Sequence, residues 1–317
     1  MYSNSNLVIV MLRKKKLRIV VLMPSSHILA HNTIKSLIRK QRGIELVAVG
    51  RSNFGIFSKT AVKKLRKHQK KVGLYYSILF LLSISFYKIK IWKSRIFGKN
   101  DLSLKQLCAL NNVAIRDFGN VHDVLNLQWI KKKEPDLIVS IGFDQIIKKS
   151  VLEIPKIGCI NVHPGLLPYY RGVMPAFWAL KTGVKRFGVS IHWMDEGIDT
   201  GDIIVKRSFK IRKNDTVQSL IEKASLISGK LLIRSLHKVR RAEFNKIIIG
   251  SFVRNARGIA GKVQRFAAMD QKIGKRIQRV KGGLGKYYAF PDRGDLKVFF
   301  ARGRKLISLK RILRKLY

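Results

Sequence analysis

Three polar residues near the middle of the chain are of the types that enzymes use on carbonyl groups. Asn161 and His163 stand two positions apart at the end of an apolar run, and Asp199 lies in an acidic stretch further along. Side chains two positions apart in a strand point to the same side, so we expect the amide and the imidazole to lie together. An imidazole and a carboxylate transfer protons, and an amide donates hydrogen bonds to a developing oxyanion. These residues predict chemistry at a carbonyl carbon.

Each of these residues alone also has a structural explanation. A histidine at a strand end is usually a hydrogen-bonded polar residue, and Asp195 and Asp199 have the types and glycine neighbours of turn residues. The ordered spacing of the whole set favours the functional interpretation. We interpret His192, on the strand before the acidic stretch, as a core or rim residue without a catalytic role.

The elements that would position these residues are short apolar runs separated by helical patterns. We expect strands at 17–23, 45–50, 113–116, 136–142, 157–163, 187–194 and 202–210. We expect helices at 32–42, 103–111 and 175–181, one that is capped by Asn120 or Asp123 and runs to 131, and one that starts at a capping box formed by Asp215 and Gln218. This alternation predicts an α/β fold with a parallel sheet and helices on both faces. Ligands bind such sheets at the carboxyl ends of the strands.

The stretch 134–212 resembles the folate-dependent formyltransferases, a family that includes glycinamide ribonucleotide, methionyl-tRNA and amino-sugar formyltransferases. The resemblance lies in Asn-x-His-Pro at 161–164, Leu-Leu-Pro at 166–168 with Arg-Gly shortly after it, and the later Ile-Asp-Thr-Gly-Asp at 198–202. It implies a Rossmann-like, mostly parallel sheet. It also implies that Asn161, His163 and Asp199 are the catalytic residues.

The resemblance further implies 10-formyltetrahydrofolate as the formyl donor, and it implies no metal. The folate ring would lie against Leu166, Leu167 and Pro168, and we assign Asp195 to the same part of the site. Arg171 can bind a phosphate or carboxylate of the acceptor, although a structural salt bridge explains this arginine equally well.

The expected chemistry gives each catalytic residue a role. Asn161 and a protonated His163 donate hydrogen bonds to the oxyanion, while Asp199 keeps His163 charged and accepts the proton of the amine. Gly165 stands where many relatives of this family have serine, which removes one hydrogen bond near the folate.

The charge of the chain is strongly unbalanced. Lys and Arg number 65 against 18 Asp and Glu, a formal net charge of +47. Nucleic acid and an anionic membrane surface are the polyanionic partners that this charge predicts, and a solvated, self-repelling surface is the remaining explanation. The two cysteines, Cys108 and Cys159, form neither a disulfide framework nor a metal-ligand spacing, which favours a reducing cytoplasm.

We divide the chain into an extension at 1–16, a catalytic domain at 17–240 with an insert at 51–100, and a basic appendage at 241–317. Translation could start at Met1 or at Met11. Within the insert, the apolar run 74–87 has basic clusters on both sides, so that 63–99 could bind the inner face of a membrane. The run is too short to span a bilayer, and a buried core helix would explain it equally well.

The acceptor amine is not determined by these residues. We favour a nucleotide-linked amino sugar or other glycan precursor, because the insert would suit an enzyme at a membrane surface. Methionyl-tRNA is the alternative that the basic charge favours, and glycinamide ribonucleotide fits least well. A basic RNA- or membrane-binding protein on an inactive formyltransferase scaffold is the non-enzymatic alternative.

Overall fold

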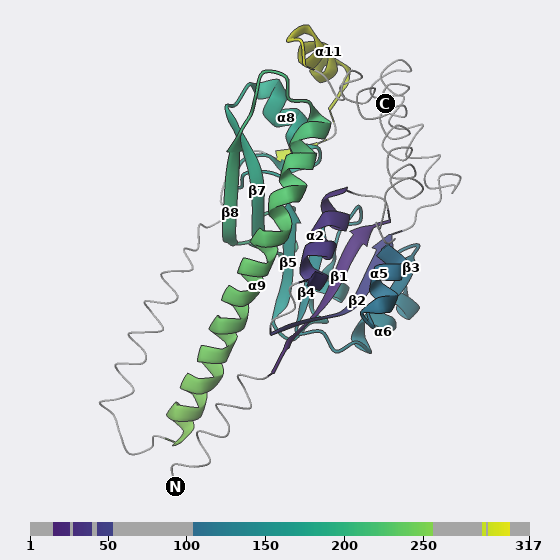
Figure 1. Ribbon diagram of the computed structural model, residues 1–317, viewed down its shortest axis with the longest axis vertical. Helices are drawn as coiled ribbons and strands as arrows, with labels where there is room; N and C mark the ends of the chain where they lie inside the picture. The colour runs from purple at the N-terminus through teal and green to yellow at the C-terminus, as the bar shows by residue number, and fades with distance from the viewer. Residues whose placement is uncertain are drawn as a thin grey trace.

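A seven-stranded sheet lies at the centre of the protein (Figure 1). The computed structural model describes residues 15–25, 28–39, 43–52, 104–255, 287–289 and 291–304. The strands of the sheet are β1 (Leu17–Pro24), β2 (Ile44–Ser52), β3 (Ala114–Phe118), β4 (Leu137–Ile141), β5 (Gly158–His163), β7 (Arg186–Trp193) and β8 (Ile203–Lys210). Their order across the sheet is β3-β2-β1-β4-β5-β7-β8.

Strands β1 to β5 run parallel to their neighbours, whereas β7 is antiparallel to β5 and β8 is antiparallel to β7. Strand β1 is buried over most of its length and β4 over all of it, and both are rich in Leu, Ile and Val. Such continuous apolar strands are typical of a sheet that is covered on both faces. The predicted α/β fold with a mostly parallel sheet is confirmed.

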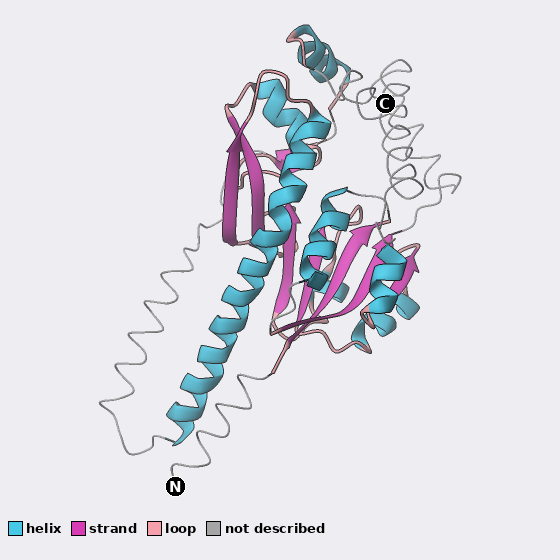
Figure 2. Ribbon diagram, in the orientation of Figure 1, coloured by secondary structure: helices cyan, strands magenta, loops and turns pink. Residues whose placement is uncertain are grey.

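Helices cover both faces of the sheet (Figure 2). On one face the core contains side chains from α2 (Ile28–Arg39), α5 (Leu104–Leu110), α8 (Pro175–Thr182) and α9 (Val217–Asn255). On the other face it contains side chains of α6 (Val124–Lys131) and α7 (Lys149–Leu152). The alternating side chains of β1 divide between the two cores, with Ile19 and Val21 in the first and Val20 and Leu22 in the second.

The cap of helix α9 lies one residue later than predicted, at Thr216 and not at Asp215. Thr216 and Ser219 exchange hydrogen bonds, each hydroxyl accepting from the backbone N–H of the other residue, at 3.1 and 2.9 Å. Asp215 accepts instead from the backbone of Arg212 and from Lys223, while Gln218 donates to another side chain of the helix. The predicted capping box was therefore one residue out of register, because two overlapping sets of polar residues compete for this helix start.

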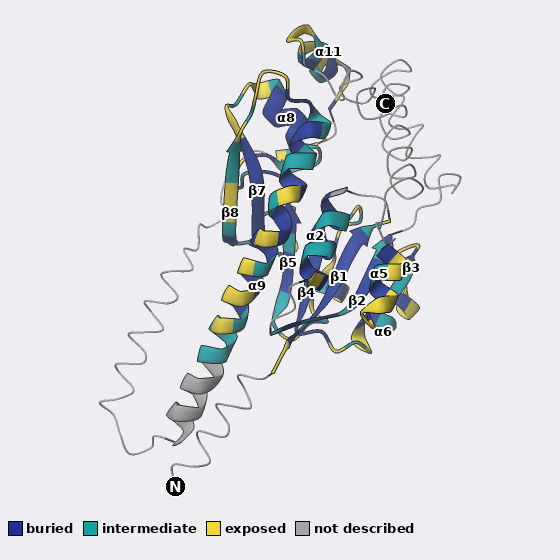
Figure 3. Cartoon of the chain, viewed as in Figure 1, coloured by how far each residue is buried: buried dark blue, intermediate teal, exposed yellow. Residues whose placement is uncertain are grey.

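Helices α2 and α9 pack closely against each other. Asn32 donates to Ser225, and the hydroxyls of Thr33 and Ser228 lie 2.5 Å apart in the buried contact. The side of α9 that faces away from the sheet is exposed (Figure 3). The helix runs on through residue 240, where we had divided the chain, and that division stays a prediction.

Residues 287–289 and 291–304 pack against the loop that contains β6 (Arg171–Gly172) and against α8. Strand β9 (Tyr287–Tyr288) pairs with β6, and α11 (Arg293–Ala301) packs against α8. The predicted insert 51–100 overlaps the end of β2 at its first two residues. Its remaining residues, 53–100, which contain the apolar run and the basic clusters, lie outside the described residues. Among the described residues no helix is both long and apolar enough to cross a membrane.

Candidate active site

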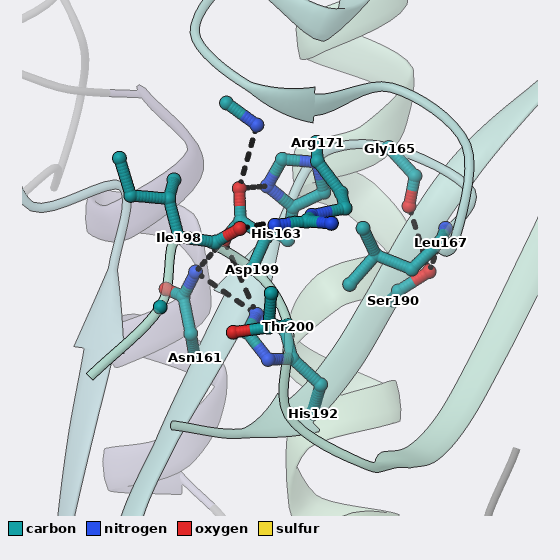
Figure 4. Close-up of polar contacts among 12 residues, drawn as sticks. Asn161, His163, Gly165, Leu167, Arg171, Ser190, His192, Ile198, Asp199 and Thr200 are labelled. Atoms are coloured by element: carbon teal, nitrogen blue, oxygen red, sulfur yellow. Dashed lines mark hydrogen bonds and ion pairs between the residues drawn. The ribbon is translucent and has the colours of Figure 1, made fainter. Parts of the chain in front are cut away.

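The polar residues predicted to act together meet at the carboxyl end of β5 (Figure 4). Asn161 and His163 extend from β5, and Asp199 reaches them from the loop between β7 and β8. Asn161 lies directly opposite His192 of β7 in the sheet register. The position at a strand end matches the edge where open α/β sheets bind ligands.

Asp199 is the centre of the cluster. Its Oδ2 lies 3.4 Å from His163 Nδ1 and accepts from the Gly172 backbone N–H at 2.8 Å. Its Oδ1 accepts from Asn161 Nδ2 at 3.2 Å and lies 3.3 Å from His192 Nε2. The backbone of Asp199 has φ +53°, a left-handed conformation that aspartate tolerates better than most residues. This turn points the carboxylate inwards.

The environment shifts the pKa values of the central pair. Burial alone raises the pKa of Asp199, but the neighbouring His163 and His192 and the Gly172 N–H outweigh it, so that the pKa lies below its usual range. Burial lowers the pKa of His163, and the Asp199 carboxylate and the Tyr170 carbonyl oppose this shift only in part. At neutral pH, Asp199 is ionised and the His163 ring is neutral.

The tautomer of His163 follows from its partners. Nε2 lies 2.9 Å from the Tyr170 carbonyl oxygen, which can only accept, so the ring proton sits on Nε2. Nδ1 then presents a lone pair towards the Asp199 carboxylate. The sequence-based expectation of a protonated ring that donates to an oxyanion does not describe this state. The pair is instead arranged to take up a proton.

His192 is buried, as expected of a core residue, and it also contacts the cluster, which the sequence did not predict. Its Nδ1 lies 2.6 Å from the Trp193 carbonyl oxygen and therefore donates, which leaves Nε2 to accept from Asn161 Nδ2 at 3.3 Å. Both N–H groups of the Asn161 amide are thus engaged, one by His192 and one by Asp199. The buried Oδ1 of Asn161 has no hydrogen-bond partner among the described residues, so it is available to an N–H donor of a ligand.

The apolar loop after β5 is fixed by polar contacts. Ser190 donates to the Gly165 carbonyl at 2.7 Å and accepts from the Leu167 N–H at 3.0 Å. A Cβ on Gly165 would lie 2.6 Å from His163 Nε2, so a serine cannot occupy this position without moving the ring. The side chains of Leu166 and Pro168 are half-buried and Leu167 is buried, and their predicted contact with folate stays a prediction.

Two further predicted residues make contacts within the loops. Asp195 is exposed and holds the acidic loop through the Gly197 N–H at 3.0 Å and the Thr200 hydroxyl. Arg171 donates through Nε to the Ile198 carbonyl at 3.0 Å, and so links its loop to the loop of Asp199. Neither contact tests the predicted binding role. The part of the chain that the structure describes contains no group of His, Cys, Asp and Glu side chains that could hold a metal ion.

Comparisons with known proteins identify the domain that contains this cluster. Residues 106–236 match the formyl transferase family. The chain is 36% identical to methionyl-tRNA formyltransferase of Syntrophus aciditrophicus over 187 residues, 58% of this chain and 59% of that protein. It is 40% identical to the Clostridioides difficile protein of the same name over 136 residues, 43% of this chain and 44% of that protein. The chain thus spans about half the length of the curated relatives it matches.

A solved structure shares the fold. Glycinamide ribonucleotide transformylase 1 from Symbiobacterium toebii superposes with a TM-score of 0.50 at 16% identity, covering 71% of this chain and 88% of that one. Residues 106–236 are therefore similar to the formyl transferase family, and the comparisons relate this part of the chain to formyltransferases.

Proposed function

We propose that this protein transfers a formyl group from 10-formyltetrahydrofolate to a primary amine. The proposal rests on the contact between the His163 ring and the Asp199 carboxylate, beside the buried amide of Asn161, in a domain of this family. A neutral imidazole, an ionised carboxylate and an amide oxygen together can orient an amine and remove its proton. Amine attack on a formyl group requires both.

Each of the three residues has a step in the proposed reaction. When bound, 10-formyltetrahydrofolate supplies the formyl carbon to which the amine nitrogen forms its new bond. Asn161 Oδ1 accepts an N–H of the amine and directs its lone pair, while Asp199 and His163 Nδ1 take up the proton that the nitrogen releases. The charge that His163 gains stabilises the carbonyl oxygen, and the same proton is returned to the leaving nitrogen of the folate as its bond to carbon breaks.

We place the donor against the loop after β5. The buried Leu167 and the half-buried Leu166 and Pro168 offer an apolar surface for a flat ring next to His163. We assign Asp195 to the folate side of the site and Arg171 to the acceptor side. Asp195 lies in the loop between β7 and β8, and Arg171 lies in the segment after β5. The hydrogen bond from Arg171 to the Ile198 carbonyl joins these two segments beside Asp199.

For the acceptor we propose methionyl-tRNA in place of the amino sugar that the insert had favoured. The curated relatives that match 35–58% of this chain are named methionyl-tRNA formyltransferases. The net charge of +47 agrees with a nucleic-acid acceptor, since phosphate contacts dominate nucleic-acid affinity. An amino sugar would leave this charge without a partner of matching size.

A basic groove supports a polyanionic acceptor. It has a volume of about 780 Å3 and lies where β1, β4 and β5 begin, against the second half of α9. Its lining contains five Lys or Arg residues and one His, but only two acidic residues, Asp136 and Glu243. Asp136 accepts a hydrogen bond from the Arg18 backbone N–H. The basic residues of the lining are Lys15, Lys16, Lys156, His237, Arg240 and Arg241. The groove is at the opposite edge of the sheet from Asp199, so it would hold phosphates remote from the reacting amine.

An acceptor screen tests the proposed function. Purified protein is mixed with 10-formyltetrahydrofolate and, separately, methionyl-tRNA, a nucleotide-linked amino sugar and glycinamide ribonucleotide, and release of tetrahydrofolate is followed. We expect turnover with methionyl-tRNA that His163→Ala abolishes. Turnover only with the amino sugar would reject the acceptor, and absence of turnover with all three would favour an inactive, polyanion-binding scaffold.

Membrane contact through residues 63–99 is a separate proposal that rests on the sequence alone, since these residues lie outside the described part of the chain. It predicts a cytoplasmic protein that floats with anionic vesicles and stops doing so when 74–87 is deleted. Vesicle binding that survives the deletion would reject it.

A further inference from the structure

A short strand late in the chain, β9, pairs with β6 in the loop beside the cluster. Strand β9 runs parallel to β6, with Tyr287 opposite Arg171 and Tyr288 opposite Gly172. The Val173 N–H extends the pairing by donating to the Tyr288 carbonyl at 3.0 Å. These are backbone contacts between segments more than a hundred positions apart.

The paired loop supplies a backbone partner to each member of the central pair. The Gly172 N–H donates to Asp199 Oδ2 at 2.8 Å, and the Tyr170 carbonyl accepts from His163 Nε2 at 2.9 Å. Gly172 has φ +95°, and a Cβ on it would lie 2.4 Å from the Tyr288 carbonyl oxygen. The loop therefore lies between the cluster on one side and β9 on the other.

Aromatic contacts hold β9 in place. The Tyr288 ring stacks on Tyr170, with centroids 5.6 Å apart, and lies 4.8 Å from the Trp178 ring. Trp178 Nε1 donates to the Ala289 carbonyl at 3.2 Å. The strand is thus fixed to the loop and to α8 together.

Helix α11 anchors the same segment to α8. Phe299 is fully buried and stacks on Phe177 with centroids 4.5 Å apart. Lys181 Nζ lies 2.5 Å from Asp295 Oδ1. A buried aromatic stack and a half-buried ion pair make this contact far stronger than a surface strand of two residues would be alone.

We propose that residues 287–304 are a positioning element of the active site, and that Tyr288 is its main contact. The segment places no side chain in the cluster of Asn161, His163, His192 and Asp199; it fixes the loop whose backbone orients His163 and Asp199. This inference rests on the proposed formyl transfer for its kinetic test only.

Substitutions in the full chain test the positioning role. Tyr288→Ala removes the stack on Tyr170, and Phe299→Ala loosens α11 at a distance, whereas Tyr288→Phe keeps the ring. Phe209→Ala is the matched control, because Phe209 is a half-buried aromatic of β8 that contacts another ring, Phe187, away from the loop.

We expect Tyr288→Ala and Phe299→Ala to lower kcat by about 10- to 100-fold, because small displacements of catalytic groups have effects of this size. The acid limb of the pH profile of kcat/KM should move to lower pH, because His163 must be neutral to accept the proton and a loosened Tyr170 carbonyl raises the pKa of His163 less. Tyr288→Phe should retain near wild-type kcat. Phe209→Ala should lower the melting temperature with no change in the pH profile. Matching kinetics and pH profiles in Tyr288→Ala and Phe209→Ala would overturn the inference.

Hydrogen exchange separates this inference from the proposed activity. We expect Tyr288→Ala to speed amide exchange in a peptide covering 169–174 at least tenfold, and Phe209→Ala to leave it unchanged. This readout needs no turnover, so an inactive wild-type protein would reject the proposed function alone. Unchanged exchange at 169–174 in Tyr288→Ala would reject the positioning role, whatever the activity.

Discussion

Asp199 accepts hydrogen bonds or faces ring nitrogens on both of its oxygens, and the charge of this group holds the cluster together. Asp199→Asn would keep the size of the side chain but would replace one carboxylate oxygen by an NH2 group, which would face the N–H of either Gly172 or Asn161. We expect kcat to fall by about 10²- to 10⁴-fold, the usual range for loss of a group that transfers protons. Steady-state kinetics with Glu196→Gln, an exposed residue of the same loop, provides the control. Activity retained in Asp199→Asn would contradict the proton-transfer role.

His192 fixes the orientation of the Asn161 amide. His192→Leu would leave one N–H of Asn161 buried without an acceptor, which costs about 1–3 kcal/mol, and would free the amide to rotate. We expect kcat to fall about tenfold, with partial recovery in His192→Gln, which restores an acceptor. Equal rates for these two variants would show that the ring acts through packing alone.

The titration of His163 links the site to stability. Because burial lowers its pKa, the unfolded chain binds a proton at this residue more readily than the folded protein does. As pH falls through the ordinary value of 6.5, protons therefore favour the unfolded state. The pKa of Asp199 is also lowered in the folded protein. Its ionised form therefore stabilises the fold at pH values above the ordinary pKa of a carboxyl group, and this stability is lost as the pH falls through the lowered pKa.

We expect His163→Gln to be less sensitive to acid than the wild type. The difference in free energy of unfolding between about pH 7.5 and about pH 5.5 should be smaller in the variant, because it lacks the group that titrates in this window. Urea unfolding at both pH values measures it. An identical difference in both proteins would mean that the pKa of His163 is not lowered.

At the scale of the elements, the periodicity of the sequence predicted which segments are strands, but it did not predict the direction of every strand. Each predicted strand from 17–23 to 202–210 is present, because runs of Val, Ile and Leu have few alternatives to a buried strand. Nothing in the periodicity states that β7 runs antiparallel to β5. That reversal places His192 opposite Asn161, which is why sequence patterns alone did not assign it to the site. The family motif, by contrast, correctly predicted that Asn161, His163 and Asp199 meet.

The packing of α2 on α9 depends on a small residue. A Cβ on Gly229 would lie 2.4 Å from the Cβ of Ser36, so Gly229→Ala would gain helix propensity but would overpack the contact. Overpacking is the larger effect, and we expect the free energy of unfolding to fall by about 1–3 kcal/mol. Adding Ser36→Gly should restore part of it. Chemical denaturation of the single and double variants measures both changes.

At the scale of the whole molecule, the charge predicts how acceptor binding responds to salt. Replacing Lys156 and Arg241 of the basic groove by glutamate should raise KM for methionyl-tRNA about tenfold at moderate salt. It should also reduce the slope of log KM against log salt by about two, one for each lost phosphate contact. Kinetics across a salt series measure this.

The control for the groove carries the same change of charge elsewhere. Lys105 and Lys132 are exposed and lie outside the groove, and their replacement by glutamate should change KM much less. Equal effects of the two double variants would mean that net charge, and no particular groove, attracts the acceptor.

Long-range contacts were the least predictable feature from the sequence. Residues 287–304 contain a Tyr-Tyr pair and a capping box at Asp292 and Asp295, yet no pattern indicates that they return to α8 and the loop of Gly172. Pairing partners far apart in the chain leave no periodic signal. The fold and the meeting of Asn161, His163 and Asp199 were therefore predictable, whereas the backbone contacts around His163 and Asp199 were not.

The pairing of β6 with β9 also affects biosynthesis. Trp178 and Ala289, which are hydrogen-bonded beside this pairing, are 111 positions apart, so a ribosome must synthesise and release residue 289 before the loop acquires these neighbours. Contacts of such separation form late, after local helices and hairpins. A nascent chain would then form its sheet first, and the loop of Gly172 would acquire its neighbours in β9 only after that.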